Sequence, residues 1–260
     1  AAIPNHSTRS ALTLLLPYIE QANLYNQIDS STPMFNGPTG YNATILAQNV
    51  AAAATVLTVF LCPSSIAKPT DSYLYPQGAF GGGFPAANCT WVGGRTDYGG
   101  TSGVRGAFGN LAYNNNQGGD REGVLRAAGN GGDRSRMRDI TDGTSNTFLL
   151  GERTGGTQMY YKNIPAPGLP AVIGQTNGGG WADALAFEHW LQGSLYDGTG
   201  NGGPCGTCTN IRGNGFHSFH TGGCQFALCD GSVRFISDNV AQITLASLIT
   251  RKKGEILGEF

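Results

Sequence analysis

The sequence predicts an α+β fold, in which a largely antiparallel β-sheet has helices at both ends of the chain. Three observations carry this prediction. Apolar residues recur at helical spacing in residues 8–28 and again in residues 239–250. Asp230-Gly231 lies between two β-prone runs, Cys224–Cys229 and Val233–Ile236, which is a strong hairpin signal because both residues tolerate the positive φ of a tight turn. The 41 glycines among 260 residues predict long loops between these ends.

The N-terminal part is expected to form two helical segments and a strand. Pro17 should kink the first helix, and the Ala-rich stretch Tyr41–Ala54 predicts the second. Val56–Leu61 is β-branched and aromatic, which predicts a buried strand that ends at Cys62-Pro63. The apolar face of the first helix should consist of Leu12, Leu15, Leu16, Ile19 and Leu24.

The remainder of the chain is expected to form short strands, long loops and a closing helix. Thr96–Gly100 and Gly123–Arg126 are possible short strands, and Phe148–Glu152 is predicted to be a core strand. We treat residues 1–260 as a single globular domain. Its parts are the N-terminal helices and first strand in 1–62, a loop-rich β region in 63–215, and the hairpin with the C-terminal helix in 216–260.

Composition excludes some classes of function. Charged residues make up 13% of the chain, against about 25% in ordinary soluble domains, and the formal net charge is −1. This balance gives no electrostatic basis for binding nucleic acid or an anionic membrane. The apolar runs are too short or too interrupted to span a bilayer, so no membrane span is expected in this chain. The opening Ala1-Ala2-Ile3-Pro4 is not a translation start, so we expect that a preceding segment has been removed.

The cysteine content is even and favours disulfides in an oxidising compartment. The competing interpretation is zinc, because Cys205 and Cys208 have metal-ligand spacing and His217, His220 and Cys224 follow closely. Disulfides are favoured because no second pair of ligands completes a zinc set. The sequence leaves the pairing open among Cys62, Cys89, Cys205, Cys208, Cys224 and Cys229.

A turn-rich segment before the Phe148–Glu152 strand is a candidate calcium site. Asp139, Asp142, Ser145 and Asn146 lie close together in a loop that contains Gly143, and hard cations take oxygen ligands from such loops. The spacing is not that of an EF-hand. The alternative, which we favour, is a turn capped by side-chain hydrogen bonds to the backbone.

His217, His220, Glu152 and Asp230 are candidates for a catalytic or transition-metal cluster, since imidazole beside carboxylate can act as a general base or bind a metal. No Gly-x-Ser-x-Gly or His-Glu-x-x-His motif accompanies them. Structural roles are therefore favoured: Asp230 belongs to the turn, and His220 fastens the strand that follows it. Glu152 ends an apolar strand, and if buried it requires a partner, for which His220 or Arg234 is expected.

The tryptophans Trp91, Trp181 and Trp190 lie in the polar middle region. If exposed, their apolar faces could stack on sugars, which would make the protein a carbohydrate-binding module. The alternative, which we favour, is that they fill the core or an interface.

Several segments together resemble the planctomycete-type prepilin-like family, which has a C-terminal His-x9-Asp-Gly motif and no established biochemical function. In this motif His220 is followed after nine residues by Asp230-Gly231, and Glu152 closes another matching segment. The matching segments are Leu15–Tyr25, Phe60–Ser64, Arg138–Glu152, His220–Ser237, Ile249–Arg251 and Gly254-Glu255.

The resemblance implies a pilin-like fold, export, and a short leader followed by a hydrophobic anchoring helix. That leader and helix are absent from this sequence. Related pseudopilins use a calcium-ordered loop, which adds to the case for Ca²⁺ near Asp142 by analogy.

The sequence thus predicts a non-catalytic, exported structural or assembly protein, a homo-oligomer or filament at the cell surface, in the periplasm or outside the cell. The alternative is a module that binds extracellular carbohydrate or another envelope component, with a glycan as partner. A metal-dependent hydrolase is the third possibility, and no sequence motif supports it.

Overall fold

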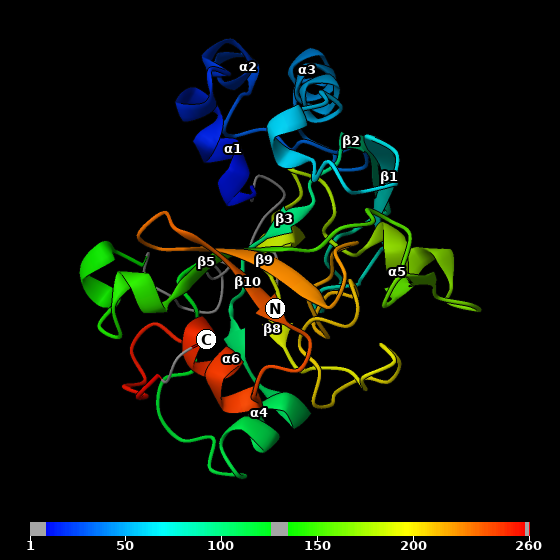
Figure 1. Cartoon of the computed structure of the whole chain (residues 1–260). Helices are drawn as coiled ribbons and strands as arrows, with labels where there is room; N and C mark the ends of the chain where they lie inside the picture. The colour runs from blue at the N-terminus through cyan, green and yellow to red at the C-terminus, as the bar shows by residue number, and fades with distance from the viewer. Residues whose placement is uncertain (1–8, 126–134, 258–259) are drawn as a thin grey trace.

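A computed structural model describes residues 9–125, 135–257 and 260, and it has the mixed α+β architecture that the sequence predicts. At its centre is a four-stranded antiparallel sheet with the strand order β10-β9-β5-β3 (Figure 1). Its strands are β3 (Tyr98–Gly99), β5 (Phe148–Glu152), β9 (Gly223–Leu228) and β10 (Val233–Ser237). The predicted core strand and hairpin are therefore confirmed, and β3 lies within the predicted Thr96–Gly100 segment.

The first of two hydrophobic cores found among the described residues lies between this sheet and two helices, α4 (Gly106–Ala112) and α6 (Gln242–Ile249). A short parallel pair, β4 (Gly103–Val104) with β8 (Trp190–Leu191), runs beside them. The predicted C-terminal helix is confirmed, with shorter bounds. We call this the sheet core; its buried side chains include Val104, Phe108, Phe148, Leu191, Phe216, Phe226, Leu228, Ile236, Leu245 and Leu248.

The second core, which we call the aromatic core, lies under the N-terminal helices. These are α1 (Ala11–Leu15), the 3-10 helix η1 (Leu16–Ile19), α2 (Ala22–Gln27) and α3 (Ala43–Ala53). They lie at one end of the molecule with the antiparallel pair β1 (Thr70–Tyr75) and β2 (Cys89–Gly94) (Figure 1). The buried side chains of this core include Leu12, Leu16, Phe35, Phe60, Tyr73, Tyr75, Trp91, Trp181 and Leu185.

Local signals explain the N-terminal helices. Ser10 and Asn42 cap α1 and α3 by accepting backbone N–H bonds. Pro17 lies in η1, where the predicted helix breaks, and the left-handed Glu20 separates η1 from α2. The predicted apolar face is only partly correct, because Leu12, Leu16 and Leu24 are buried whereas Leu15 is 39% exposed.

Several small elements complete the described fold. The hairpin β6 (Tyr160–Tyr161) and β7 (Ile164–Pro165) and the helix α5 (Ala171–Gln175) lie within residues 63–215, the predicted loop-rich β region. The short 3-10 helices there are η3 (Met137–Asp139), η4 (Thr144–Asn146) and η5 (Ala184–Phe187). Among the described residues, no helix is both long and apolar enough to cross a membrane.

Two predicted strands are wrong. Val56–Leu61 contains the 3-10 helix η2 (Thr58–Phe60), so the first strand of the fold is β1, outside residues 1–62. The run still buries Leu57 and Phe60 in the aromatic core, so its apolar pattern reflected burial and not strand pairing. Of Gly123–Arg126, residues 123–125 are not in a strand, and Arg126 lies outside the described residues.

The β9–β10 hairpin has the predicted position but a different turn. Gly231 has a φ of +88°, whereas Asp230 is not among the non-glycine residues with positive φ. The Leu228 N–H donates to Ser232 O, and the Gly231 N–H donates to Leu228 O. A three-residue connection with one left-handed glycine therefore replaces the expected two-residue turn with two positive φ angles. Asp230 Oδ1 completes it by accepting bonds from the Ser232 N–H and Oγ–H.

Candidate functional site

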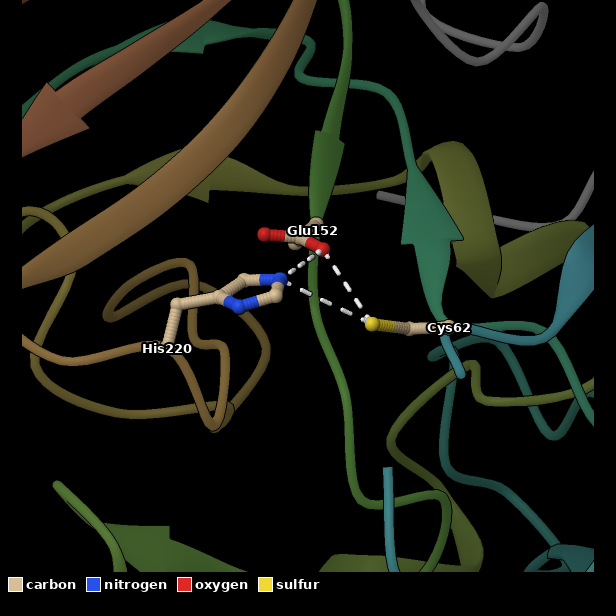
Figure 2. A group of neighbouring side chains, drawn as sticks. All are labelled: Cys62, Glu152 and His220. Atoms are coloured by element: carbon tan, nitrogen blue, oxygen red, sulfur yellow. Dashed lines mark hydrogen bonds and ion pairs between the residues drawn. The ribbon is translucent and has the colours of Figure 1, made fainter. Parts of the chain in front are cut away.

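Three side chains from distant parts of the sequence converge at one end of β5: Cys62, Glu152 and His220 (Figure 2). Cys62 Sγ lies 3.4 Å from Glu152 Oε1 and 3.9 Å from His220 Nε2. His220 Nε2 lies 3.2 Å from the same Glu152 oxygen. We call these three residues the Cys–Glu–His cluster. Among the described residues, it is the one group of three or more His, Cys, Asp or Glu side chains found to converge closely enough for a metal ion.

Glu152 holds the centre of this cluster because of its place in the sheet. It is the last residue of β5 and is buried, and its Oε2 accepts a 2.7 Å bond from the Gln225 N–H on the neighbouring strand β9. A buried carboxylate requires such partners. Glu152 is thus buried, and of the two partners expected for a buried Glu152 it pairs with His220, whereas Arg234 is exposed on β10.

Cys62 is positioned through its backbone. It follows η2, and its N–H donates a 2.8 Å bond to Asp97 Oδ2. Asp97 is itself buried and forms an ion pair with the buried Arg95. Burial raises the pKa of Asp97, an effect that Arg95 opposes. The backbone of Cys62 is therefore held beside the segment between β2 and β3. This attachment does not involve the Cys62 thiol.

His220 lies in the loop before β9, where its N–H donates to Ser218 Oγ. Its side chain is 33% exposed, whereas that of Glu152 is 3% exposed. The cluster therefore meets solvent through the imidazole.

The arrangement differs from a nucleophile–base relay. Burial, followed by the neighbouring carboxylate of Glu152, raises the pKa of the Cys62 thiol, whose S–H donates a hydrogen bond to Glu152 Oε1. A catalytic base activates its nucleophile with one imidazole nitrogen while an acid orients the other. Here the same Nε2 faces both the thiol and the carboxylate. The cluster can therefore join three segments of the chain, and its donor atoms are of types that transition metals bind.

The other members of the predicted His/Glu/Asp cluster lie elsewhere. His217 Nδ1 lies 2.9 Å from Thr154 Oγ1, its Nε2 lies 2.5 Å from Lys162 O, and its ring stacks on Tyr160. Asp230 belongs to the hairpin turn, where its hydrogen bonds to Ser232 lower its pKa. Only Glu152 and His220 of the predicted four come together.

Cys62 is the member that sequence reasoning missed, because it was assigned to the disulfides. A signal was present: Phe60–Ser64 is one of the segments that carry the family resemblance, as are Arg138–Glu152 and His220–Ser237. The structure brings one residue from each of these three segments into the cluster.

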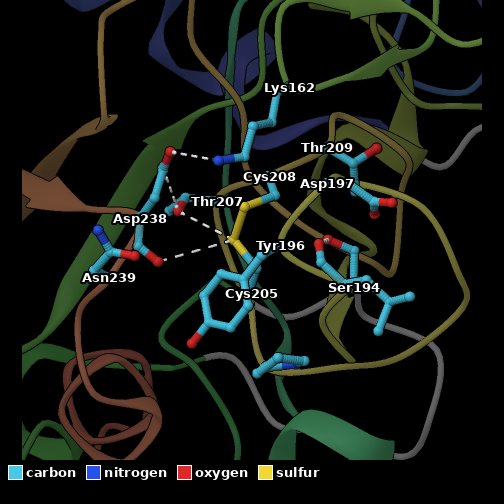
Figure 3. The surroundings of a disulfide bond; sticks show 12 residues. Lys162, Ser194, Tyr196, Asp197, Cys205, Thr207, Cys208, Thr209, Asp238 and Asn239 are labelled. Atoms are coloured by element: carbon cyan, nitrogen blue, oxygen red, sulfur yellow. Dashed lines mark hydrogen bonds and ion pairs between the residues drawn. A yellow bond between two sulfur atoms is a disulfide. The ribbon is translucent and has the colours of Figure 1, made fainter.

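The structure contains one of the expected disulfides, Cys205–Cys208, whose Cα atoms are 5.8 Å apart (Figure 3). Both sulfurs are buried, with Thr207 and Asp238 beside them. The bond excludes the zinc interpretation of this pair, because neither sulfur is available as a thiolate. The other candidates are free thiols, which is a correction to the expectation of six disulfide cysteines. They lie on separate elements: Cys62 after η2, Cys89 in β2, Cys224 in β9 and Cys229 after it.

The candidate calcium segment is held together by its own hydrogen bonds. Asp142 accepts N–H bonds from Lys253 and Gly254, one on each carboxylate oxygen, and Asp139 caps η3 by accepting from the Arg136 N–H. Asn146 donates to Asp142 O. Ser145 is in η4. These bonds support the turn interpretation, and calcium binding stays a prediction.

The tryptophans do not form an exposed aromatic surface. Trp91 and Trp181 are buried in the aromatic core, where the Trp181 Nε1–H donates to Thr55 O. Trp190 is half-buried beneath the guanidinium of Arg105. Two of the three rings are thus unavailable for stacking on a sugar, and glycan binding by other residues stays a prediction.

Comparison with known proteins identifies the family of the chain. A family model described as a protein of unknown function (DUF1559) matches residues 2–242, which is most of the chain. No curated protein and no solved structure matches it.

Proposed function

The chain belongs to the DUF1559 family of proteins of unknown function, and on that premise we propose that it is an exported, non-catalytic structural protein of pilin-like type that self-associates. The observation that supports this best is an N-terminal helical segment that is apolar on both sides. Leu12, Leu16 and Leu24 face the aromatic core. Leu14 and Tyr18 point outward, and they are 59% and 83% exposed.

Such a surface favours association with a second copy of the chain. Leu14 in α1 and Tyr18 in η1 are both exposed, and Leu15, which lies between them in the sequence, is also partly exposed. Residues 11–27 contain a single charged side chain, Glu20, so little charge would be desolvated or repelled on contact. Exposed apolar patches on soluble domains commonly mark interaction surfaces.

One further feature supports export. The buried Cys205–Cys208 disulfide is of a kind that persists in oxidising compartments.

Association is testable by light scattering coupled to size-exclusion chromatography over a range of protein concentrations, with negative-stain microscopy of the largest species. We expect the wild-type chain to form concentration-dependent oligomers or filaments. The variant Tyr18→Glu should shift the population to monomers because it places a charge on the apolar surface.

The matched control is Ile164→Glu, which changes a side chain that is 70% exposed on β7 and outside the N-terminal helices. It should associate like the wild type. A wild-type chain that stays a monodisperse monomer at every concentration would refute the proposal. So would a Tyr18→Glu variant that associates as strongly as the wild type. Circular dichroism checks that both variants fold.

A further inference from the structure

We propose that the Cys–Glu–His cluster binds one transition-metal ion of the zinc class, with Cys62 Sγ, Glu152 Oε1 and His220 Nε2 as protein ligands and a fourth position open to solvent. The inference rests on the mutual geometry of the three atoms, the chemistry of the donors and the contacts that hold them.

The geometry matches three corners of a tetrahedron. Zinc binds sulfur at about 2.3 Å and nitrogen or oxygen at about 2.0–2.2 Å, which places tetrahedral ligand atoms roughly 3.3–3.6 Å apart. The corresponding separations here are 3.2 Å for nitrogen to oxygen, 3.4 Å for sulfur to oxygen and 3.9 Å for sulfur to nitrogen. Shifts of a few tenths of an ångström would therefore place an ion among them.

The donor set selects the class of metal. A thiolate and an imidazole favour Zn²⁺ and neighbouring transition metals, whereas Ca²⁺ and Mg²⁺ prefer sets made only of oxygens. Binding replaces the Cys62 thiol proton, which is released to solvent, while the thiolate and the Glu152 carboxylate balance the two charges of the ion.

The ligands are held by second contacts before any ion arrives. The Gln225 N–H donates a hydrogen bond to Glu152 Oε2. The other oxygen, Oε1, faces Cys62 Sγ and His220 Nε2. Asp97 fixes the backbone of Cys62, and Ser218 fixes that of His220. Contacts of this kind orient the ligands in metal sites. The partly exposed imidazole lies on the solvent side, where an ion and a fourth ligand can enter.

Metal binding is tested on the untagged full chain, without a thiol reductant so that Cys205–Cys208 stays bonded. Calorimetric titration with Zn²⁺ should give one site per chain. Co²⁺ should give a thiolate-to-cobalt charge-transfer band. Cys62→Ser should abolish that band. Cys62→Ser, Glu152→Gln and His220→Asn should each weaken zinc binding by about 100-fold or more, since loss of a second-shell contact alone costs roughly 10–100-fold.

Cys229→Ser is the matched control, because it removes a free thiol outside the cluster. It should retain both the stoichiometry and the cobalt band. The proposal is overturned if the wild-type chain binds no zinc, if zinc binding persists in all three ligand variants, or if the cobalt–thiolate band survives Cys62→Ser. Circular dichroism of each apo variant separates lost ligands from lost folding.

Discussion

The aromatic core and the sheet core are stabilised in different ways. The sheet core consists mainly of aliphatic and phenylalanine side chains, such as the stacked Phe148 and Phe226, between the four-stranded sheet and the helices α4 and α6. The aromatic core is bordered by buried polar groups: the Tyr75 hydroxyl donates to Asp183, and Arg95 pairs with Asp97. Burial of apolar area tolerates adjustment, whereas a buried charge depends on its specific partner.

The Cys–Glu–His cluster lies where these two regions meet. Cys62 follows Phe60 of the aromatic core, while Glu152 and His220 come from the segments that build the sheet. The difference between the regions therefore matters for the cluster. Glu152 accepts a bond from the neighbouring strand of the sheet, whereas the backbone N–H of Cys62 is bound to the carboxylate of a buried ion pair.

The largest effect is expected from breaking that ion pair. Asp97→Ala would leave the guanidinium of Arg95 buried without its carboxylate and would remove the acceptor of the Cys62 N–H. We expect a loss of about 3–5 kcal/mol in the free energy of unfolding, because removal of one member of a buried pair strands its partner. Urea denaturation followed by circular dichroism measures this change.

The control is Arg138→Ala, which removes an exposed partner of Asp139. Its expected cost is below about 1 kcal/mol, in line with other surface ion pairs. If Asp97→Ala cost no more than this control, the buried ion pair would not be what stabilises the region around the aromatic core.

The same contrast explains how much of the fold the sequence reveals. Phe148–Glu152, the β9–β10 hairpin and the C-terminal helix follow local rules of alternation, turn chemistry and helical spacing, and these predictions were confirmed. β1 and β2 were missed although β2 alternates in burial, because a long loop joins them and the Gly-rich context hides their pairing. A short apolar run such as Val56–Leu61 indicates burial but does not specify the conformation of its backbone.

The candidate site was predictable only in part, for a related reason. A buried carboxylate requires a partner, and the expected partners of Glu152 were His220 and Arg234, of which the structure places His220 beside it. Cys62 lies 90 residues from Glu152 in the sequence, and no local pattern indicates contact over that separation. The disulfide connectivity was equally inaccessible, because cysteine count does not determine pairing.

The second prediction concerns the turn of the sheet hairpin. Gly231 has a φ of +88° and nothing near the position of an added Cβ, so Gly231→Ala tests backbone conformation without steric overlap. We expect a loss of about 1–2 kcal/mol, which is the usual cost of a left-handed alanine. Gly231→Asn should lose less, since asparagine adopts this conformation more readily. Equal stabilities of all three proteins, measured by urea denaturation, would show that the left-handed backbone at position 231 does not limit the stability of the hairpin.

The smallest effect is expected from pH, through a histidine beside the sheet core. His189 is buried, its ring contacts Phe216, and its Nδ1 accepts the Gly213 N–H. Burial, then the nearby guanidinium groups of Arg153, Arg212 and Arg105, holds the pKa of His189 well below its usual value.

Below about pH 6.5 the unfolded chain therefore binds a proton at His189 that the folded chain does not, so the free energy of unfolding falls as pH falls. Between pH 6.5 and 5.5 this contribution is about 1 kcal/mol. His189→Asn keeps an acceptor and does not titrate, so its unfolding free energy should fall less over the same interval. Parallel pH profiles of the two proteins would mean that the buried imidazole does not make the folded state pH-sensitive.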